Sequence, residues 1–257
     1  MTKGICTVFC LIALCGGLAA ACHFHQANAQ AGSTQLRMFK PPADGVINVA
    51  FIVSDQTALI DLAGPWEVFG DTMLGPHGGP WRGSGDMIMP FNLFSVSDSL
   101  KPISVAGLQV VPNYTFENAP KPRVIVIPAQ GGRSEAQKRW LLENAKTADI
   151  TMSVCTGASM LAGYGLLDHQ RATTHHLFID EMQRKYPTVE FVTGLRYVDN
   201  GKIATAGGLS SGIDLALHVV ERYYGDEIAQ ATADYMEYRG ELWKNPQYGS
   251  VKYVAGR

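Results

Sequence analysis

Cysteine is scarce in this sequence of 257 residues, and its distribution is uneven. Cys6, Cys10, Cys15 and Cys22 lie close to the N-terminus, and Cys155 is the only cysteine beyond them. If the N-terminal stretch is removed, the remaining chain cannot form an internal disulfide and must be stabilised by packing. A lone thiol in an oxidising compartment is also open to oxidation to the sulfenic and sulfinic acids.

Charged residues are also few, and their signs are balanced. They make up 17% of the chain, the formal net charge is -2, and no run of Lys or Arg occurs. Proteins that bind nucleic acid usually carry a basic field, so the sequence argues against nucleic acid as a partner. Hydrophobic residues make up 46%, which suits one large domain with a single core and excludes a disordered or fibrous protein.

Histidine patterns that would hold a metal ion or complete a simple triad are missing. The closest pair is the adjacent His175-His176, which cannot easily chelate one ion, so we predict no metal and no cofactor. No histidine adjoins Cys155 in the sequence, but His175 is a candidate to line its pocket.

The N-terminus is a segment of its own, which we predict to be a signal peptide over residues 1–29. Lys3 is followed by an uncharged apolar run over residues 5–21 and then by small residues that end at Ala29. This order is typical of a bacterial secretory signal, and the run is short for a membrane span. We expect cleavage after Ala29 and a periplasmic or secreted protein. The alternative is a lipid anchor at Cys22 and a membrane-anchored lipoprotein facing the periplasm.

After the signal, strands and helices alternate. Residues 30–45 predict a flexible lead-in, residues 46–240 a single domain, and residues 241–257 a C-terminal tail packed on or near it. Strands that alternate with helices imply a mostly parallel sheet covered on both faces, which is an α/β fold. The expected strands are 46–53, 91–96, 123–127 and 150–154, the hairpins 103–111 and 195–206, and the helices 65–72, 134–145, 177–185, 211–224 and 227–236.

Cys155 stands at the predicted corner between a strand and a helix. Ser153 and Gly157 are small residues two positions to either side, as a nucleophile on a strained strand-to-helix turn requires. The first amides of the helix would favour thiolate over thiol, so we expect a thiol pKa below its ordinary value of about 8.5. The alternative is a buried cysteine that acts as a small hydrophobic residue.

Asp61 is a carboxyl group within an apolar stretch, just before Pro65, where a helix is expected to begin. It is either a cap of that helix or an acid beside the thiol, because ligands of such sheets bind at the carboxyl ends of the strands. Beside the thiol, the two groups would share one proton, and the carboxylic acid would donate to sulfur and act as a general acid.

Other loops at the same strand ends carry further candidates. Gly131 and Gly132 leave backbone amides open to stabilise an anion, or they form an ordinary turn. Gly208 lies in a similar glycine-containing loop. Thr156 follows the cysteine, so its amide and hydroxyl could both face a substrate, or it could be only the first residue of the helix.

Three motifs together resemble the ThiJ/PfpI superfamily. They are DLAGPWEVF at 61–69, SVCTGA at 153–158 followed by GLLD at 165–168 and RATTH at 171–175, and AGGLSSGIDLAL at 206–217. Within the superfamily the chain is most similar to the branch of the isonitrile hydratases and of the amidotransferase-like domains of AraC-type regulators. The resemblance covers residues 46–240. It implies a flavodoxin-like three-layer sandwich with a nucleophile elbow, related to class I glutamine amidotransferases and commonly a homodimer.

The resemblance also implies roles for the candidate residues. Cys155 would be the nucleophile, Asp61 its acid and Thr156 an assisting group, with Gly131, Gly132 and Gly208 near the substrate. We therefore expect an exported, cysteine-dependent hydratase or hydrolase of a small carbon–nitrogen compound, converting isonitriles to N-substituted formamides. The alternative is a domain of the same fold that binds a small molecule, or senses thiol oxidation, without turnover.

Two internal features depart from the family pattern. Ala129 and Gln130 separate the glycines at 131 and 132 from the proline that they usually follow. The sequence therefore does not determine which amides stabilise an anion. Residues 75–89 form a glycine-rich insertion, interpreted either as a lid or as a loose loop. Thr156 stands where the glyoxalase and protease branches carry histidine, which weakens those activities as candidates.

Overall fold

The computed structural model describes residues 38–43 and 45–247. The predicted signal peptide, Ala29 and Cys22 lie outside the described residues, as do most of the lead-in and the end of the tail. Within the described ranges, none of the helices has the length and apolar character that crossing a membrane demands.

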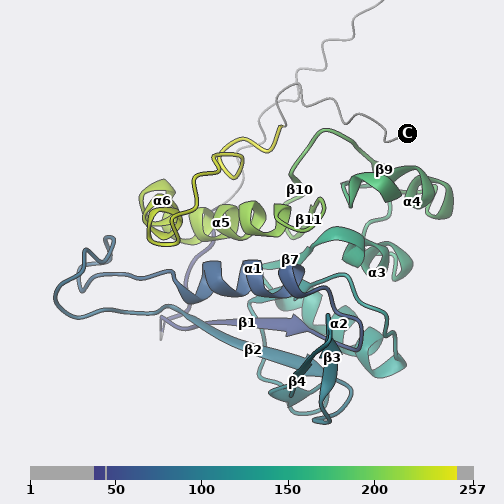
Figure 1. The fold of residues 1–257 in the computed structure, drawn as a ribbon, viewed down its shortest axis with the longest axis horizontal. Helices are drawn as coiled ribbons and strands as arrows, with labels where there is room; N and C mark the ends of the chain where they lie inside the picture. Colours follow the sequence, from purple (N-terminus) through teal and green to yellow (C-terminus); the bar gives the residue numbers. More distant parts are fainter. Residues whose placement is uncertain (1–37, 44, 248–257) are drawn as a thin grey trace, which may run out of the picture. The chain divides into compact units, whose positions relative to one another are not determined.

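A 7-stranded sheet runs through the centre of the domain (Figure 1). Its order is β10-β11-β7-β6-β1-β2-β5, and every neighbouring pair is parallel except β10 with β11. The mostly parallel sheet predicted from the sequence is therefore confirmed. The strands are β1 (Ile47–Ile52), β2 (Phe91–Ser97), β5 (Tyr114–Thr115), β6 (Val124–Ile127), β7 (Ile150–Ser153), β10 (Tyr197–Asp199) and β11 (Ile203–Ala206).

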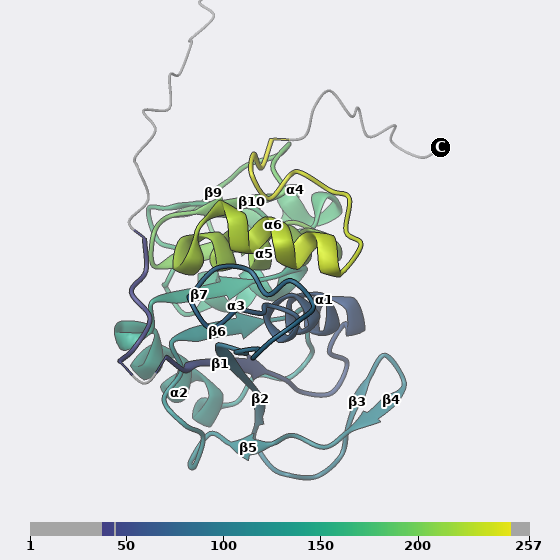
Figure 2. The ribbon, with the colours of Figure 1, turned by 90° about the vertical axis from the view of Figure 1, so that its left-hand side faces the viewer.

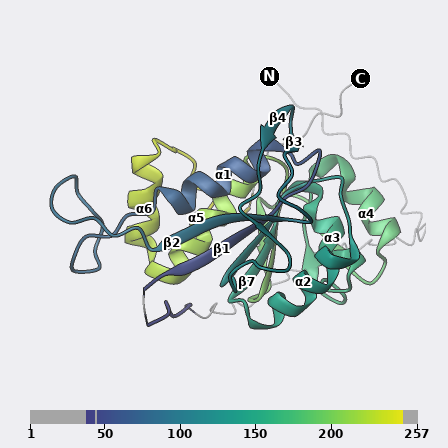
Figure 3. The ribbon, with the colours of Figure 1, turned by 90° about the horizontal axis from the view of Figure 1, so that it is seen from below.

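Helices cover both faces of the sheet, as Figure 2 and Figure 3 show from two further directions. Alternate residues of β1 enter different cores: Val49 and Phe51 join one hydrophobic cluster, and Ala50 and Ile52 join the other. The first cluster contains side chains of α1, α5 and α6, and the second contains side chains of α2, α3 and α4. The helices are α1 (Leu59–Gly70), α2 (Glu135–Thr147), α3 (Ala158–Gly163), α4 (Ile179–Lys185), α5 (Ser211–Tyr224) and α6 (Asp226–Tyr235).

Short elements complete the described chain. The hairpin expected around Gly107 is present as an antiparallel pair, β3 with β4. A second small sheet pairs β8 with β9 in parallel. Their bounds are β3 (Ile103–Val105), β4 (Leu108–Val110), β8 (Arg171–Ala172) and β9 (Glu190–Phe191), and the 3₁₀ turns are η1 (Cys155–Gly157) and η2 (His176–Phe178).

The first helix begins earlier than the sequence predicts. Helix α1 starts at Leu59, so Pro65 lies inside it and Asp61 lies in its first turn. The prediction that Pro65 begins the helix is therefore wrong. A proline inside a helix removes one backbone hydrogen bond. Here the burial of the apolar side of α1, including Val68 and Phe69, keeps the helix in place across it.

The glycine-rich insertion is not a lid over the cysteine. Residues 71–90 connect the end of α1 to the start of β2 and project from the domain (Figure 1). Since β1 and β2 are parallel, this connection lies at the amino ends of the strands, whereas Cys155 follows the carboxyl end of β7. Within it, Arg82 forms an ion pair of 3.2 Å with Glu227 of α6. The lid interpretation of residues 75–89 is wrong.

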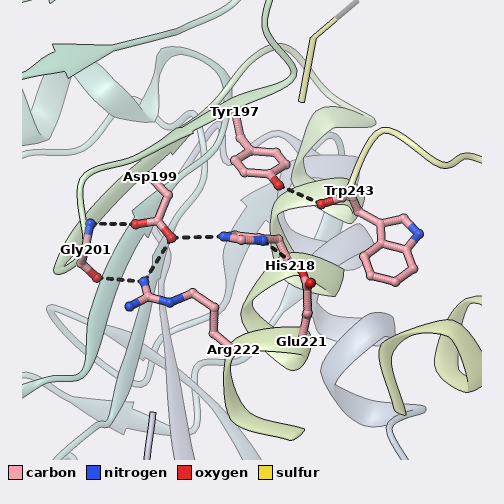
Figure 4. Close-up of polar contacts among 7 residues, drawn as sticks. All are labelled: Tyr197, Asp199, Gly201, His218, Glu221, Arg222 and Trp243. Carbon is pink, nitrogen blue, oxygen red and sulfur yellow. Dashed lines mark hydrogen bonds and ion pairs between the residues drawn. The ribbon is translucent and has the colours of Figure 1, made fainter. Parts of the chain in front are cut away.

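The described part of the C-terminal tail packs on the domain. Trp243 has no exposed surface, and the Tyr197 hydroxyl donates a hydrogen bond of 2.6 Å to its carbonyl oxygen (Figure 4). The N–H of Arg196 donates to the carbonyl of Pro246 at 2.6 Å. The tail is therefore fixed to the start of β10 at two points.

A largely buried histidine, His218, links α5 to the end of β10 (Figure 4). Nε2 of His218 lies 3.0 Å from Asp199, and Nδ1 lies 3.1 Å from Glu221. Arg222 also donates to Asp199 at 2.9 Å, and the imidazole stacks on Tyr197 with ring centroids 4.7 Å apart. Burial by itself lowers the pKa of His218, but the hydrogen bonds to the two carboxylates outweigh it and raise the pKa. The folded state thus favours the imidazolium form.

We expect His218→Gln to destabilise the protein more at pH 5.5 than at pH 9. The pKa of the ring is about 6.5 in the unfolded chain and higher in the fold, so its stabilisation is complete below pH 6.5 and disappears as the pH rises through the folded value. At low pH the loss should be about 1–3 kcal/mol, as for a buried group that loses a charged partner. Urea unfolding at both pH values measures it.

His77→Gln, at an exposed loop position, is the matched control and should change the free energy of unfolding little at either pH. Equal losses for His218→Gln at both pH values would mean that the ring is neutral in the fold.

Candidate functional site

The backbone at Cys155 has the strained conformation of a nucleophile elbow. Its φ is 58°, in the left-handed region, which costs a residue with a side chain about 1–3 kcal/mol. Two distant segments hold it there. The N–H of Cys155 donates to the carbonyl of Gly207 at 2.8 Å, and its carbonyl accepts from the Thr174 hydroxyl at 2.8 Å. The strain is thus maintained by tertiary contacts.

The glycine that follows the elbow is required by space. A β-carbon at Gly157 would lie 2.2 Å from the carbonyl oxygen of Ile127 and 2.9 Å from that of Pro128. The φ of Gly157 is an ordinary -54°, so conformational freedom is not the reason for glycine here. The close approach lets the start of the helix lie directly against the end of β6. Ser153, the other small residue, is fully buried in β7.

The loops that follow four strands meet at this corner. The loop after β6 contacts α1, because the N–H of Ala129 donates to Oδ2 of Asp61 at 3.1 Å. It also contacts the loop after β1, through Gly132 and Ser54. The loop after β11 accepts the hydrogen bond from Cys155. The carboxyl edge of the sheet therefore brings Asp61 and Cys155 together.

Asp61 is a fully buried carboxyl group beside the thiol. Its Oδ1 atom has no hydrogen-bond partner among the described residues. Burial raises the pKa of Asp61 to about 6, although the N–H of Ala129 and the thiol of Cys155 each lower it in part. A carboxyl with this pKa exchanges its proton near neutral pH, as an acid–base catalyst must.

The thiol is less acidic than the sequence predicts. Cys155 is only 8% exposed, and burial, followed by the charge of Asp61, raises its pKa to about 11. The expected thiol pKa below 8.5 is therefore wrong, because burial and a neighbouring carboxylate outweigh the helix amides. Between these two pKa values the pair holds one proton and one negative charge. The resting proton lies on sulfur, the reverse of the expected donation from Asp61 to sulfur.

Two amides and a hydroxyl partly oppose this increase. Hydrogen bonds from the N–H groups of Thr156 and Leu209, and from the Thr156 hydroxyl, lower the pKa of Cys155. These donors would stabilise the sulfur when it becomes negative. Leu209 was not predicted. Its φ of 51° is unusual for leucine and is set by tertiary contacts, so no sequence signal beyond the glycine-rich motif marks it.

The predicted glycines take other positions. The N–H of Gly131 donates to the carbonyl of Asp55 at 3.2 Å, and that of Gly132 to the Ser54 hydroxyl at 3.0 Å. The prediction that these amides are open to a substrate is therefore wrong for this structure, since both fix the loop after β6 to the loop after β1. Gly208 packs against a ring instead: a β-carbon there would lie 2.3 Å from Cδ2 of His175.

The imidazole ring of His175 packs directly against Gly208. Its Nδ1 accepts from the N–H of Leu177 at 3.3 Å, and its ring stacks on His176 with centroids 4.5 Å apart. Burial and the neighbouring His176 lower the pKa of His175, so the ring is neutral at pH 7. The arrangement suits a neutral residue at the rim of the site. Among residues 38–43 and 45–247, no cluster of His, Cys, Asp and Glu side chains could hold a metal ion.

The sequence pattern of the DJ-1/PfpI family matches residues 47–222, which include Asp61, the elbow and the loop after β11. The chain belongs to the DJ-1/PfpI family. An isonitrile hydratase from Pseudomonas putida is 30% identical over 199 residues, which are 75% of this chain and 78% of the hydratase. The HTH-type transcriptional regulator GbdR of Pseudomonas aeruginosa is 29% identical over 136 residues, which are 51% of this chain but 37% of the regulator.

A solved structure supports the same assignment of the fold. The crystal structure of a ThiJ/PfpI family protein from Pseudomonas syringae superimposes with a TM-score of 0.64. It is 22% identical in sequence, and the match covers 85% of this chain and 84% of that chain. The DJ-1/PfpI fold carries both enzymes and regulators, so the function has to be inferred from the site.

Proposed function

We propose that this DJ-1/PfpI protein is a cysteine-dependent hydratase that converts isonitriles to N-substituted formamides. The observation that carries the proposal is the pairing of the Cys155 thiol with the buried carboxyl of Asp61, whose pKa burial raises to about 6. The similarity to an isonitrile hydratase over most of both chains supports the substrate class. The donors of Thr156 and Leu209 complete the site.

The proposed reaction transfers one proton twice, first from the thiol to Asp61 and then from Asp61 to the substrate. Asp61 accepts the thiol proton while the sulfur of Cys155 attacks the terminal carbon of the isonitrile, and it then delivers that proton to the same carbon. The product is a thioimidate, in which a C–S and a C–H bond have formed. Water adds to this carbon, the C–S bond breaks, and the N-substituted formamide leaves as the thiol regains a proton. Two easier steps thus replace one difficult addition.

Export and dimer formation belong to the same proposal. The basic, apolar and small-residue order of residues 1–29 supports secretion to the periplasm, with Cys22 as the lipid-anchor alternative. The resemblance to a commonly dimeric superfamily supports a homodimer. The proposed partner is a small apolar or aromatic isonitrile, with no nucleic acid.

A panel of aliphatic and aromatic isonitriles tests the function, with simple amides as a second substrate class. We expect N-substituted formamides by mass spectrometry, and a Cys155 peptide whose mass increases by that of one isonitrile after rapid acid quenching. If the amides release ammonia and no isonitrile yields a formamide, the protein is a hydrolase and the hydratase proposal is rejected. No product from either class, from folded protein, would reject catalysis.

A second candidate is a domain that binds a small molecule without turnover. The low exposure and raised pKa of Cys155, and the similarity to the regulator GbdR, favour it. An isonitrile or amide that raises the melting temperature while no product forms would support this candidate against the hydratase.

Asp61→Asn should change turnover and thiol reactivity in opposite directions. Formamide release should fall by about 10²–10⁴-fold, the usual contribution of a general acid or base. Alkylation of Cys155 by iodoacetamide at pH 8 should become faster, because the charge of Asp61 raises the thiol pKa and asparagine removes that charge. Asp180→Asn, on the exposed side of α4, is the control and should change neither rate. An unchanged alkylation rate in Asp61→Asn would mean that the carboxylate of Asp61 does not influence the thiol pKa.

A further inference from the structure

A buried ion pair that the proposed reaction does not use lies at the start of α5. Nε of Arg196 is 2.5 Å from Oδ2 of Asp214, and the two side chains are 11% and 0% exposed. The Tyr238 hydroxyl donates to Oδ1 of Asp214 at 2.9 Å. Taking each charge out of water costs several kcal/mol, and the attraction between the two charges does little more than offset that cost, so such a pair is weak evidence for stability alone. The pair also contacts the loop after β11, through Arg196.

Arg196 contacts both ends of the loop after β11. Its carbonyl accepts from the N–H of Gly207 at 2.8 Å, and its Nη2 donates to the Ser210 hydroxyl at 3.2 Å. Leu209 lies between these two contacts with a φ of 51°. Non-glycine residues keep such a conformation only where surrounding contacts enforce it. Arg196 supplies two of those contacts.

The same loop contacts the nucleophile twice. The carbonyl of Gly207 accepts from the N–H of Cys155 at 2.8 Å, and the N–H of Leu209 points at the sulfur. A shift of the loop would therefore move the elbow and one of its anion donors together. Such donors lose much of their effect when they are displaced by about 1 Å.

The C-terminal segment supports the pair from outside the loop. Besides the hydrogen bond from Tyr238, the N–H of Arg196 donates to the carbonyl of Pro246 at 2.6 Å, and Leu195 forms a β-bridge with Gln247. The tail thus fixes the backbone of Arg196, while Asp214 of α5 and Ser210 of the loop hold its guanidinium.

We propose that Arg196 and Asp214 are positioning residues, which hold residues 207–210 in the strained shape that aims the N–H of Leu209 at the Cys155 sulfur. They act through the loop and do not touch the reacting atoms. When the thiol loses its proton, this amide stabilises the negative charge. The effect on turnover rests on the proposed function, whereas the effect on the thiol does not.

The pH dependence of Cys155 alkylation tests the proposal. The reagent is iodoacetamide, and the rate is read by mass spectrometry on the peptide that contains Cys155, so the N-terminal cysteines do not interfere. In Asp214→Asn the N–H of Leu209 should move away from the sulfur, so the thiolate loses a charge-assisted hydrogen bond. The apparent thiol pKa should therefore rise, and alkylation at pH 8 should slow about 3- to 10-fold. With an isonitrile that the wild type converts, kcat should fall while KM stays nearly constant.

Asp149→Asn provides a matched control. Asp149 pairs with Arg123 at 2.7 Å and accepts from the Tyr223 hydroxyl at 2.6 Å, which is the same set of partner types away from the loop. This variant should lose stability as Asp214→Asn does but keep the alkylation profile of the wild type. A purely structural role for Arg196 and Asp214 predicts the same result for both variants, and that result would overturn the proposal.

Ser210→Ala decides the question if Asp214→Asn fails to fold. It removes only the contact from Nη2 of Arg196 to the loop, at an exposed position. A smaller rise of the apparent thiol pKa supports the proposal, and a profile identical to the wild type overturns it. A shifted alkylation profile in a protein that converts no isonitrile would keep the positioning role and reject the hydratase.

Discussion

Cys155→Ala should reduce formamide release to the rate of the uncatalysed reaction. Removal of a catalytic nucleophile in a covalent mechanism typically costs on the order of 10⁵- to 10⁶-fold in kcat. Alanine cannot form the thioimidate, and Asp61 then has no proton to transfer to the isonitrile carbon. Progress curves for wild type and variant on the same isonitrile, at equal protein concentration, measure the loss.

The fold should survive this substitution. Alanine has a β-carbon, as cysteine does, so the φ of 58° stays equally strained, and only the mostly buried sulfur is removed. The free energy of unfolding should fall by no more than about 1–2 kcal/mol, as for a small core truncation. Equal formamide release from wild type and variant would end the covalent mechanism, whatever the stability.

Gly157→Ala should give the largest loss of stability among single methyl additions near the site. The added β-carbon would lie 2.2 Å from the carbonyl oxygen of Ile127, which is backbone in the centre of the sheet and cannot rotate away. Overpacking of this kind costs about 1–3 kcal/mol, and a backbone clash is at or above the upper value. The start of α3 must move, so turnover should fall with stability. Urea unfolding and the isonitrile assay measure both.

Gly79→Ala is the matched control, because the β-carbon would meet nothing within 4 Å and its φ is not positive. Its free energy of unfolding should stay within about 0.5 kcal/mol of the wild type. A Gly157→Ala protein as stable and active as this control would show that β6 and the elbow can separate without cost.

The sequence predicts best those features that depend on local pattern. The strands of the parallel sheet are short apolar runs such as Val124–Ile127, buried on every side, and they stand out between helical patterns. The elbow is recognisable because small residues flank Cys155. The family motifs lead to the same fold, which the match over residues 47–222 confirms.

Features that depend on long-range packing were not predictable. The low acidity of Cys155 arises from burial and from Asp61, which is distant in the sequence and close only in the fold. Leu209 keeps its strained φ between two contacts to Arg196, which directly precedes β10. The amides of Gly131 and Gly132 looked open in the sequence because their acceptors belong to the loop after β1.

The glycine-rich connection over residues 71–90 gives the protein a natural attachment point. It leaves the domain at the edge of the sheet opposite the sulfur, and several of its glycines, including Gly78, Gly79 and Gly83, have open space where a side chain would begin. A short peptide tag inserted between Gly78 and Gly79 would anchor the protein to a resin or electrode with the reactive edge turned toward the solution. Immobilised in this way, the domain would present the face that carries Cys155 to test compounds in the flowing solution.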